Sequence, residues 1–235
     1  MTDRQIYRTA GVCSLAAIAI FFIEFPFYLV RGAFPSMDQA AELPAYSARN
    51  ATNIVSCLFL DLLILTLVMV FLAGLRHLLL RANPQHEWAA TLFFGAGIAY
   101  VTLTLIADSL QAATVVDALS SPANPVIIRA MIESMYLMYG SVALWLMAVL
   151  MAIPAWVTMQ SGALPRWSAW LGYACSASCL AFVPSMFVLH VDANGFYNPA
   201  GWGPLGIASG FPLAAWTIAM GVLLLRQPEP HSAGL

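Results

Sequence analysis

Six long runs of apolar residues follow one another along the chain, at about residues 9–30, 53–76, 88–116, 126–153, 166–190 and 204–225. The apolar core of a bilayer is about 30 Å thick and needs about 20 residues of helix to cross it, and each run meets that length. The runs are continuous rather than alternating, and they far exceed the about 11 residues of a barrel strand. The pattern predicts an all-α fold, a single domain over residues 1–235 with six transmembrane helices.

Composition supports this interpretation. Of 235 residues, 61% are hydrophobic and only 9% are charged, whereas about a quarter of the residues of a soluble domain are charged. A chain this apolar excludes a soluble enzyme and a disordered scaffold. Nine Arg, no Lys and a net charge of −2 leave no basic surface for nucleic acid. The absence of Lys also excludes Schiff-base chemistry. Membrane lipids are therefore the expected surroundings.

The arginines predict the orientation of the spans. In bacterial and other membranes, cytoplasmic loops carry an excess of Arg and Lys. Three arginines lie at one end of the predicted spans: Arg31, Arg49 and Arg129. Six lie at the other end: Arg4, Arg8, Arg76, Arg81, Arg166 and Arg226. The excess of six over three places both termini in the cytoplasm.

Three segments then lie outside, at 31–52, 117–125 and 191–203. The first is long for a connection between spans and contains Ser36 three residues before Gln39, which is the spacing of a capping box. The sequence predicts a short surface helix at about 37–43, ended by Pro44, across the outer mouth. Pro184 is expected to kink the fifth span near its outer end.

Small residues at four-residue spacing mark close helix packing in membranes. The fifth span carries Ser168, Gly172 and Ser176, and the sixth carries Gly206, Gly210 and Ala214. Two interpretations stay open for the stripe of the sixth span. It packs within the bundle, or it forms the seam of a homo-oligomer.

The positions of the histidines and cysteines indicate whether the chain can bind a metal or haem, or form a disulfide relay. The four Cys, all inside spans and without a C-x-x-C pair, are Cys13, Cys57, Cys175 and Cys179. This disfavours a disulfide relay. His77, His86 and His231 lie at the cytoplasmic end or in the tail, and His190 alone lies near the outer boundary. They cannot supply facing haem ligands or an imidazole cluster, so we expect no metal ligands and no cofactor.

Four carboxylates lie inside the predicted spans, although an Asp at the centre of a membrane helix costs about 2.5–3.5 kcal/mol. They are Glu24, Asp61, Asp108 and Glu133, on four different helices. With a rise of about 1.5 Å per residue, all four lie in the outer half of the membrane. They are the candidate catalytic residues.

Each carboxylate shares a helix face with other polar side chains, because residues three, four, seven or eight apart lie on the same side. The candidate ligand-binding residues on these faces are Asn53, Tyr28, Tyr100, Thr104, Gln111, Arg129 and Tyr136. His190, at the outer end of the fifth span, is a further candidate because it lies at the same level. Polar stripes on apolar helices turn inward. The sequence therefore predicts an outward-facing polar pocket within the bundle.

These groups could also satisfy one another without a ligand. Arg129 is four residues from Glu133, and Arg31 can reach Glu24. Two arginines cannot neutralise four buried carboxylates, however, so at least one carboxylate is expected to be protonated or to bind a ligand. Asp61 and Asp108 are the candidates for a protonated acid, because neither has an Arg on its own stripe.

Three classes of function fit such a pocket. In the first, a protonated acid transfers a proton to a small lipophilic or amphiphilic molecule, as in membrane isomerases and cyclases, with aromatic residues such as Tyr28, Tyr100 and Tyr139 lining the cavity. In the second, the carboxylates serve a proton-coupled transporter or a substrate-binding membrane subunit. In the third, the chain is an accessory or structural subunit. We favour acid–base chemistry over the other two classes.

Three short segments carry a family resemblance: Arg8-Thr9-Ala10-Gly11, Phe59-Leu60-Asp61-Leu62-Leu63, and Ser161-Gly162-Ala163-Leu164-Pro165-Arg166. They resemble a bacterial six-span integral-membrane family of unknown function. The resemblance covers spans one to five in layout, and the long outer loop and the Arg129/Glu133 pair depart from it. It implies the six-span fold in a bacterial inner membrane, and it transfers no reaction and no catalytic residues.

Overall fold

The computed structural model describes residues 1–32, 35, 37–120, 122–188, 195–199 and 203–227. Within these ranges the chain forms helices and no strand, as the apolar pattern predicts. The α-helices are α1 (Asp3–Arg31), α2 (Leu43–Arg49), α3 (Ala51–Ala82), α4 (Glu87–Leu119), α5 (Pro125–Leu137), α6 (Ala143–Ser161), α7 (Arg166–Phe182) and α8 (Phe211–Leu225). The protein is an all-α, polytopic bundle.

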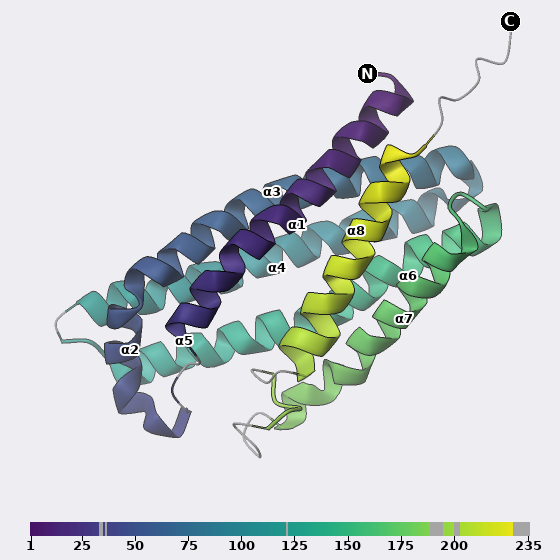
Figure 1. Cartoon of the computed structure of the whole chain (residues 1–235). Coiled ribbons are helices and arrows are strands. Elements are labelled where there is room, and N and C mark those ends of the chain that lie inside the picture. The colour runs from purple at the N-terminus through teal and green to yellow at the C-terminus, as the bar shows by residue number, and fades with distance from the viewer. Residues whose placement is uncertain (33–34, 36, 121, 189–194, 200–202, 228–235) are drawn as a thin grey trace, which may run out of the picture.

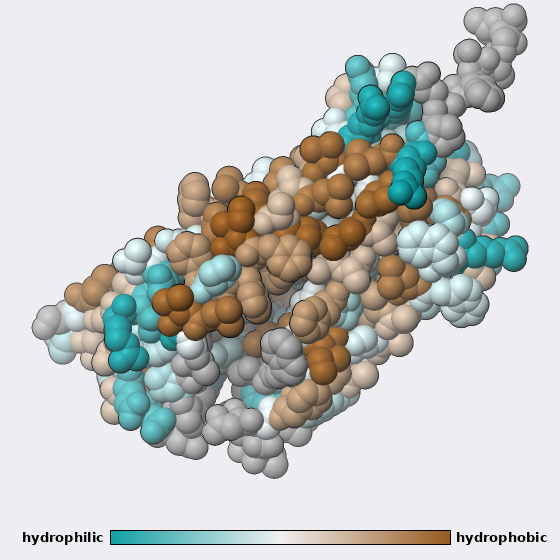
Figure 2. Space-filling model, viewed as in Figure 1, coloured by the Kyte–Doolittle hydropathy of each residue, from teal (hydrophilic) through white to brown (hydrophobic). Residues whose placement is uncertain are grey.

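Six helical segments of the described chain are long and apolar enough to cross a membrane, and they match the six predicted spans. Their bounds are Asp3–Arg31, Ala51–Ala82, Pro84–Leu119, Pro125–Ser161, Arg166–Phe187 and Gly203–Leu225. Most extend beyond the apolar runs because polar residues continue the helix at its ends. The visible surface is apolar along its middle and hydrophilic towards both ends (Figure 2), as expected of a multi-pass membrane protein.

Both ends of the described chain lie at the same end of the bundle, and α2 lies at the opposite end (Figure 1). This arrangement follows from an even number of spans. The loops that join α3 to α4 and α6 to α7 lie with the termini, while the segment containing α2 lies at the far end. We call the end with α2 the outer end. Its placement outside the cytoplasm stays a prediction from the arginine count.

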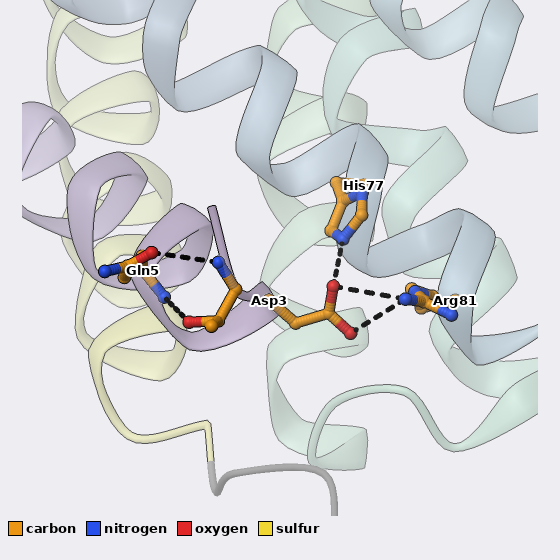
Figure 3. A network of polar contacts seen from close by, with 5 residues as sticks. Asp3, Gln5, His77 and Arg81 are labelled. Carbon is orange, nitrogen blue, oxygen red and sulfur yellow. Dashed lines mark hydrogen bonds and ion pairs between the residues drawn. The ribbon is translucent and has the colours of Figure 1, made fainter.

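The N-terminus of α1 is fixed by a capping box and an ion-pair network (Figure 3). The Thr2 N–H donates to Gln5 Oε1 over 2.9 Å, and the Gln5 N–H donates back to Thr2 Oγ1 over 3.3 Å. This satisfies two backbone donors that a helix start leaves open. Asp3, in the first turn, lies 2.9 Å from His77 Nε2 and 3.2 Å from an Arg81 nitrogen. The network joins the beginning of α1 to the end of α3.

Small residues allow α1 to pack closely against its two neighbours near this end. A Cβ added to Gly74 of α3 would lie 2.2 Å from the Ala10 Cβ, and one added to Gly221 of α8 would lie 2.3 Å from Ser14 Oγ. The Ser14 hydroxyl donates to the Thr217 carbonyl over 2.8 Å. Without a hydrophobic force between helices in lipid, such close packing is a principal source of stability.

The stripe predicted on the fifth span packs within the bundle. Ser168, Gly172 and Ser176 of α7 are all buried. A Cβ on Gly172 would lie 2.9 Å from the Ala155 Cβ of α6, and the Ser176 hydroxyl donates to the Ala148 carbonyl over 2.9 Å. These residues therefore hold α6 and α7 together.

The short outer helix exists, but its bounds differ from the prediction. Residues Met37–Glu42 form a 3₁₀ helix, and α2 then continues through Pro44 to Arg49. Pro44 lies in the first turn of α2, where a missing N–H costs nothing, so it begins the helix rather than ending it. Leu43, Tyr46 and Ser47 of α2 are buried. The predicted cap, Ser36, lies outside the described residues.

Three irregular helical segments interrupt the outer half of the bundle. Residues Met138–Val142, between α5 and α6, form a π-helical turn, and Gly203–Gly210, before α8, form another. At Pro184 the α-helix has ended and the chain continues as a 3₁₀ helix over Val183–Val188, because proline cannot donate the next helical hydrogen bond. The Ser141 and Ser185 hydroxyls, 3.0 Å apart, join two of these segments.

Candidate functional site

Three of the four predicted carboxylates come together in the outer half of the bundle. Glu24 of α1 and Asp61 of α3 interact side chain to side chain, and both interact electrostatically with Asp108 of α4. Glu24 is 1% exposed and Asp108 is 5% exposed, while Asp61 is half-buried. We call Glu24, Asp61 and Asp108 the acidic cluster. Their helices position them because each carboxylate points from its span towards the same part of the interior.

Tyr139 contacts the acidic cluster through Asp108. Its hydroxyl donates to Asp108 Oδ1. Tyr139 lies in the π-helical turn Met138–Val142, and the extra residue of a π turn rotates the side chains that follow. Sequence reasoning counted Tyr139 among the aromatic lining but not among the site residues, because helical spacing from Glu133 assumes a regular α-helix.

Arg31 supplies positive charge beside the cluster. Its guanidinium carbon lies 4.3 Å from the centre of the Tyr28 ring, a cation–π distance. The charge of Arg31 acts on Glu24 and Asp61, and the Tyr28 side chain interacts with Glu24. The predicted ligand-binding residue Tyr28 therefore lies beside the acidic cluster.

Several polar atoms here are buried and have no hydrogen-bond partner among the residues that the structure describes. They are Glu24 Oε1, Asp108 Oδ2, Gln111 Nε2 and Ser47 Oγ. Each such atom costs about 1–3 kcal/mol, more when the group is charged, and native proteins contain few of them. Two of these atoms belong to the acidic cluster, and Gln111 lies one helical turn from Asp108 on α4. A bound polar group at the cluster would supply the hydrogen bonds that they lack.

An apolar cavity of about 100 Å³ lies next to the acidic cluster, bounded by α1, α3, α4, α6 and α8. Phe21 of α1 and Leu65 of α3 line it, one helical turn from Glu24 and from Asp61 respectively. Tyr100 of α4 belongs to both regions, since it lines the cavity and interacts with Asp61 and Asp108. The cluster and the cavity are therefore neighbouring parts of one region.

The fourth carboxylate, Glu133, is placed differently. Arg129 Nε lies 2.8 Å from Glu133 Oε1 within α5, and both side chains are partly exposed, at 39% and 25%. The structure thus gives Glu133 a partner on its own helix and does not bring it to the acidic cluster. A partly exposed pair at this spacing contributes about 0.3–0.5 kcal/mol.

The other predicted ligand-binding residues lie in different parts of the outer half, and one of them lies outside the described residues. Thr104 and Gln111 lie buried on the same helix as Asp108, and the Thr104 hydroxyl donates to the Tyr100 carbonyl over 3.0 Å. Tyr136 packs beside α2, next to the buried Leu43. Asn53 is half-buried near the start of α3. His190 lies outside the described residues.

The small-residue stripe of the sixth span lies against this chain's own cavity. Gly210 and Ala214 line the cavity, and Gly206 is buried in the π-helical segment before α8. Assembly of a homo-oligomer through this stripe stays a prediction. Within the described ranges, no group of three or more His, Cys, Asp or Glu side chains is arranged to hold a metal ion.

No family model, curated protein or solved structure matches the chain. The resemblance to a bacterial six-span family therefore stays a prediction.

Proposed function

We propose that this is a multi-pass protein of a bacterial inner membrane that binds a small lipophilic or amphiphilic molecule in the outer half of its bundle. The polar end of the molecule lies at the acidic cluster, and its apolar part lies in the adjoining cavity. One observation carries this proposal. Tyr100 borders both regions, where Glu24 Oε1 and Asp108 Oδ2 have no hydrogen-bond partner among the described residues.

Acid–base chemistry on the bound molecule is the reaction that these groups support best. Asp61 or Asp108, in its protonated form, donates a proton to an alkene or carbonyl, and a second carboxylate accepts a proton from a neighbouring carbon. When proton loss directly follows proton gain, the double bond moves and the reaction is an isomerisation. When a second alkene of the same molecule first attacks the cation, its π bond becomes a new carbon–carbon bond and the reaction is a cyclisation; no electrons are gained or lost in either case. The Tyr139 hydroxyl holds Asp108 in position, and aromatic faces stabilise positive charge that develops on carbon.

The buried face of α3 between the two polar regions supports this reaction over proton-coupled transport. A transport route would join the acidic cluster to His77 at the other end of α3. Along α3 the buried residues between Asp61 and His77 are Leu65, Phe71, Leu72, Gly74 and Leu75. These side chains offer no polar group to a solute or a proton. On α3, this apolar stretch separates Asp61 from the Asp3–His77–Arg81 network.

Mass spectrometry of molecules extracted from the purified protein tests the proposed site. The unmodified chain is compared with Asp61→Asn and Asp108→Asn, which remove charge with little change in shape. Glu87→Gln is the control, because Glu87 is exposed at the opposite end of α4. We expect a molecule that co-purifies with the unmodified chain and with the control, and that is lost or chemically altered in the two Asp variants. The same molecules in equal amounts in all four preparations would rule out these carboxyl groups as contacts.

A further inference from the structure

When more than one of its three carboxyl groups is ionised, the acidic cluster carries more negative charge than the guanidinium of Arg31 balances. Within the described part of the chain, Arg31 is the cation whose charge reaches Glu24 and Asp61, and the hydrogen bond described for Asp108 is with Tyr139. Charge buried in a membrane without a counter-charge is costly. A bound group with a positive charge would remove that cost when more than one carboxyl group is ionised.

The carboxyl oxygens of the cluster that have no hydrogen-bond partner among the described residues also indicate which hydrogen-bonding groups a ligand carries. Glu24 Oε1 and Asp108 Oδ2 are carboxyl oxygens on side chains that are at least nine-tenths buried. An ionised carboxylate can only accept hydrogen bonds. A ligand that pairs with these oxygens in their ionised form therefore needs N–H or O–H donors. A primary ammonium group carries three donors and a positive charge, and it meets both conditions.

The cavity limits the shape of the molecule. Its volume of about 100 Å³ is below the about 150 Å³ of an apolar cavity that binds benzene. It therefore holds a short stretch of hydrocarbon rather than a whole lipid. α1 and α8 meet where Ser14 bonds to Thr217 and diverge towards the outer end (Figure 1). Phe21 of α1 and Leu213 of α8 both line the cavity, which makes the space between these two helices the route that we assign to the rest of the chain.

Resting on the function proposed above, we infer that the bound molecule is a single-chain amphiphile with a primary ammonium head. The head donates hydrogen bonds to the ionised carboxylates of Glu24 and Asp108, which leaves Asp61 as the protonated acid of the proposed reaction. The first part of the chain fills the cavity beside Phe21, Leu65 and Tyr100. The remaining chain leaves the bundle between α1 and α8. The two carboxyl oxygens recognise the head, while the cavity holds only the first part of the chain. Binding therefore depends more on the chemistry of the head than on the length of the chain.

Four ligands with the same chain test this inference: dodecylammonium, dodecyltrimethylammonium, dodecanol and dodecanoate. Binding of each radiolabelled ligand is measured on the unmodified protein in nanodiscs, and empty nanodiscs of the same lipid are subtracted. We expect dodecylammonium to bind at least about tenfold more tightly than the other three, since hydrogen bonds to charged groups are the strongest of their kind. Glu24→Gln and Asp108→Asn are expected to reduce this preference, and Glu87→Gln is expected to preserve it.

The outcomes separate the two proposals. Specific binding of dodecanol or dodecanoate as tight as that of dodecylammonium would overturn the ammonium head and leave the proposed site intact. Equal binding of the trimethylammonium ligand, which has no N–H group, would overturn the hydrogen bonds to Glu24 and Asp108. If none of the four binds above the empty nanodisc, both the inference and the proposed function fail. Because the head comparison uses the unmodified chain, it does not depend on how the variants fold.

Discussion

Replacing Gly74 with alanine is expected to destabilise the bundle by about 1–3 kcal/mol, the usual cost of adding a methyl group to a well-packed interior. The added Cβ would lie 2.2 Å from the Cβ of Ala10, which is 1% exposed. Ala10 has no flexible side chain that could move aside, so α1 as a whole must shift away from α3. The free energy of unfolding can be followed by circular dichroism during titration of mixed micelles with a denaturing detergent.

Gly95→Ala is the matched control for this change. Gly95 lies within α4, is exposed, and has nothing within 4 Å of the position of an added Cβ. Alanine is also a better helix former than glycine by about 1 kcal/mol in water. The control is therefore expected to be as stable as the unmodified chain or slightly more stable. An equal loss of stability in both variants would show that α1 and α3 do not pack as described.

Replacing Ala214 with phenylalanine is expected to abolish ligand binding at the proposed site. Ala214 lines the cavity from α8, opposite Phe21 and Leu65. A benzyl group there occupies space that the apolar part of the ligand needs, and it fills a void without burying a polar atom. We expect the co-purifying molecule to fall to the background of a mock purification, while the free energy of unfolding stays unchanged or increases.

Ala215→Phe adds the same side chain one residue further along α8. Ala215 is exposed and does not line the cavity, so its phenylalanine points to lipid. This variant is expected to retain the molecule at the level of the unmodified chain. Retention of the molecule by Ala214→Phe would place the binding site elsewhere, and its loss from both variants would indicate a general disturbance of α8.

The spans could be predicted because bilayer thickness and hydrophobicity alone determine them. The six runs of the sequence reappear as six spanning segments. The local backbone could not be predicted as well. Pro44 is compatible with both the end and the beginning of a helix, and burial of Leu43 and Tyr46 decides in favour of the beginning. The π turn at Met138–Val142 left no recognisable pattern in the sequence.

Helical spacing could predict which residues of the site share a helix face, but it could not predict which helices face one another. Glu24, Asp61 and Asp108 each lie on a polar stripe of a separate apolar helix, and the structure brings these three together. Glu133 has the same kind of stripe, yet its partner is Arg129 on the same helix. Residue spacing cannot decide between a partner on the same helix and one on another helix. The cavity was also beyond prediction, because it depends on where α1 and α8 diverge.

Photo-crosslinking tests the central claim most directly, namely that the acidic cluster and the apolar cavity form one binding site. Dodecylamine and dodecanol, each with a diazirine near the middle of the chain, are irradiated with the protein in nanodiscs, and the labelled residues are mapped by peptide mass spectrometry. Our account predicts that at least one of the two probes labels Phe21, Leu65 or Leu213, which line the cavity, and that Ala214→Phe removes this label. Labels confined to exposed side chains such as Val55 and Phe59, unchanged by Ala214→Phe, would contradict it.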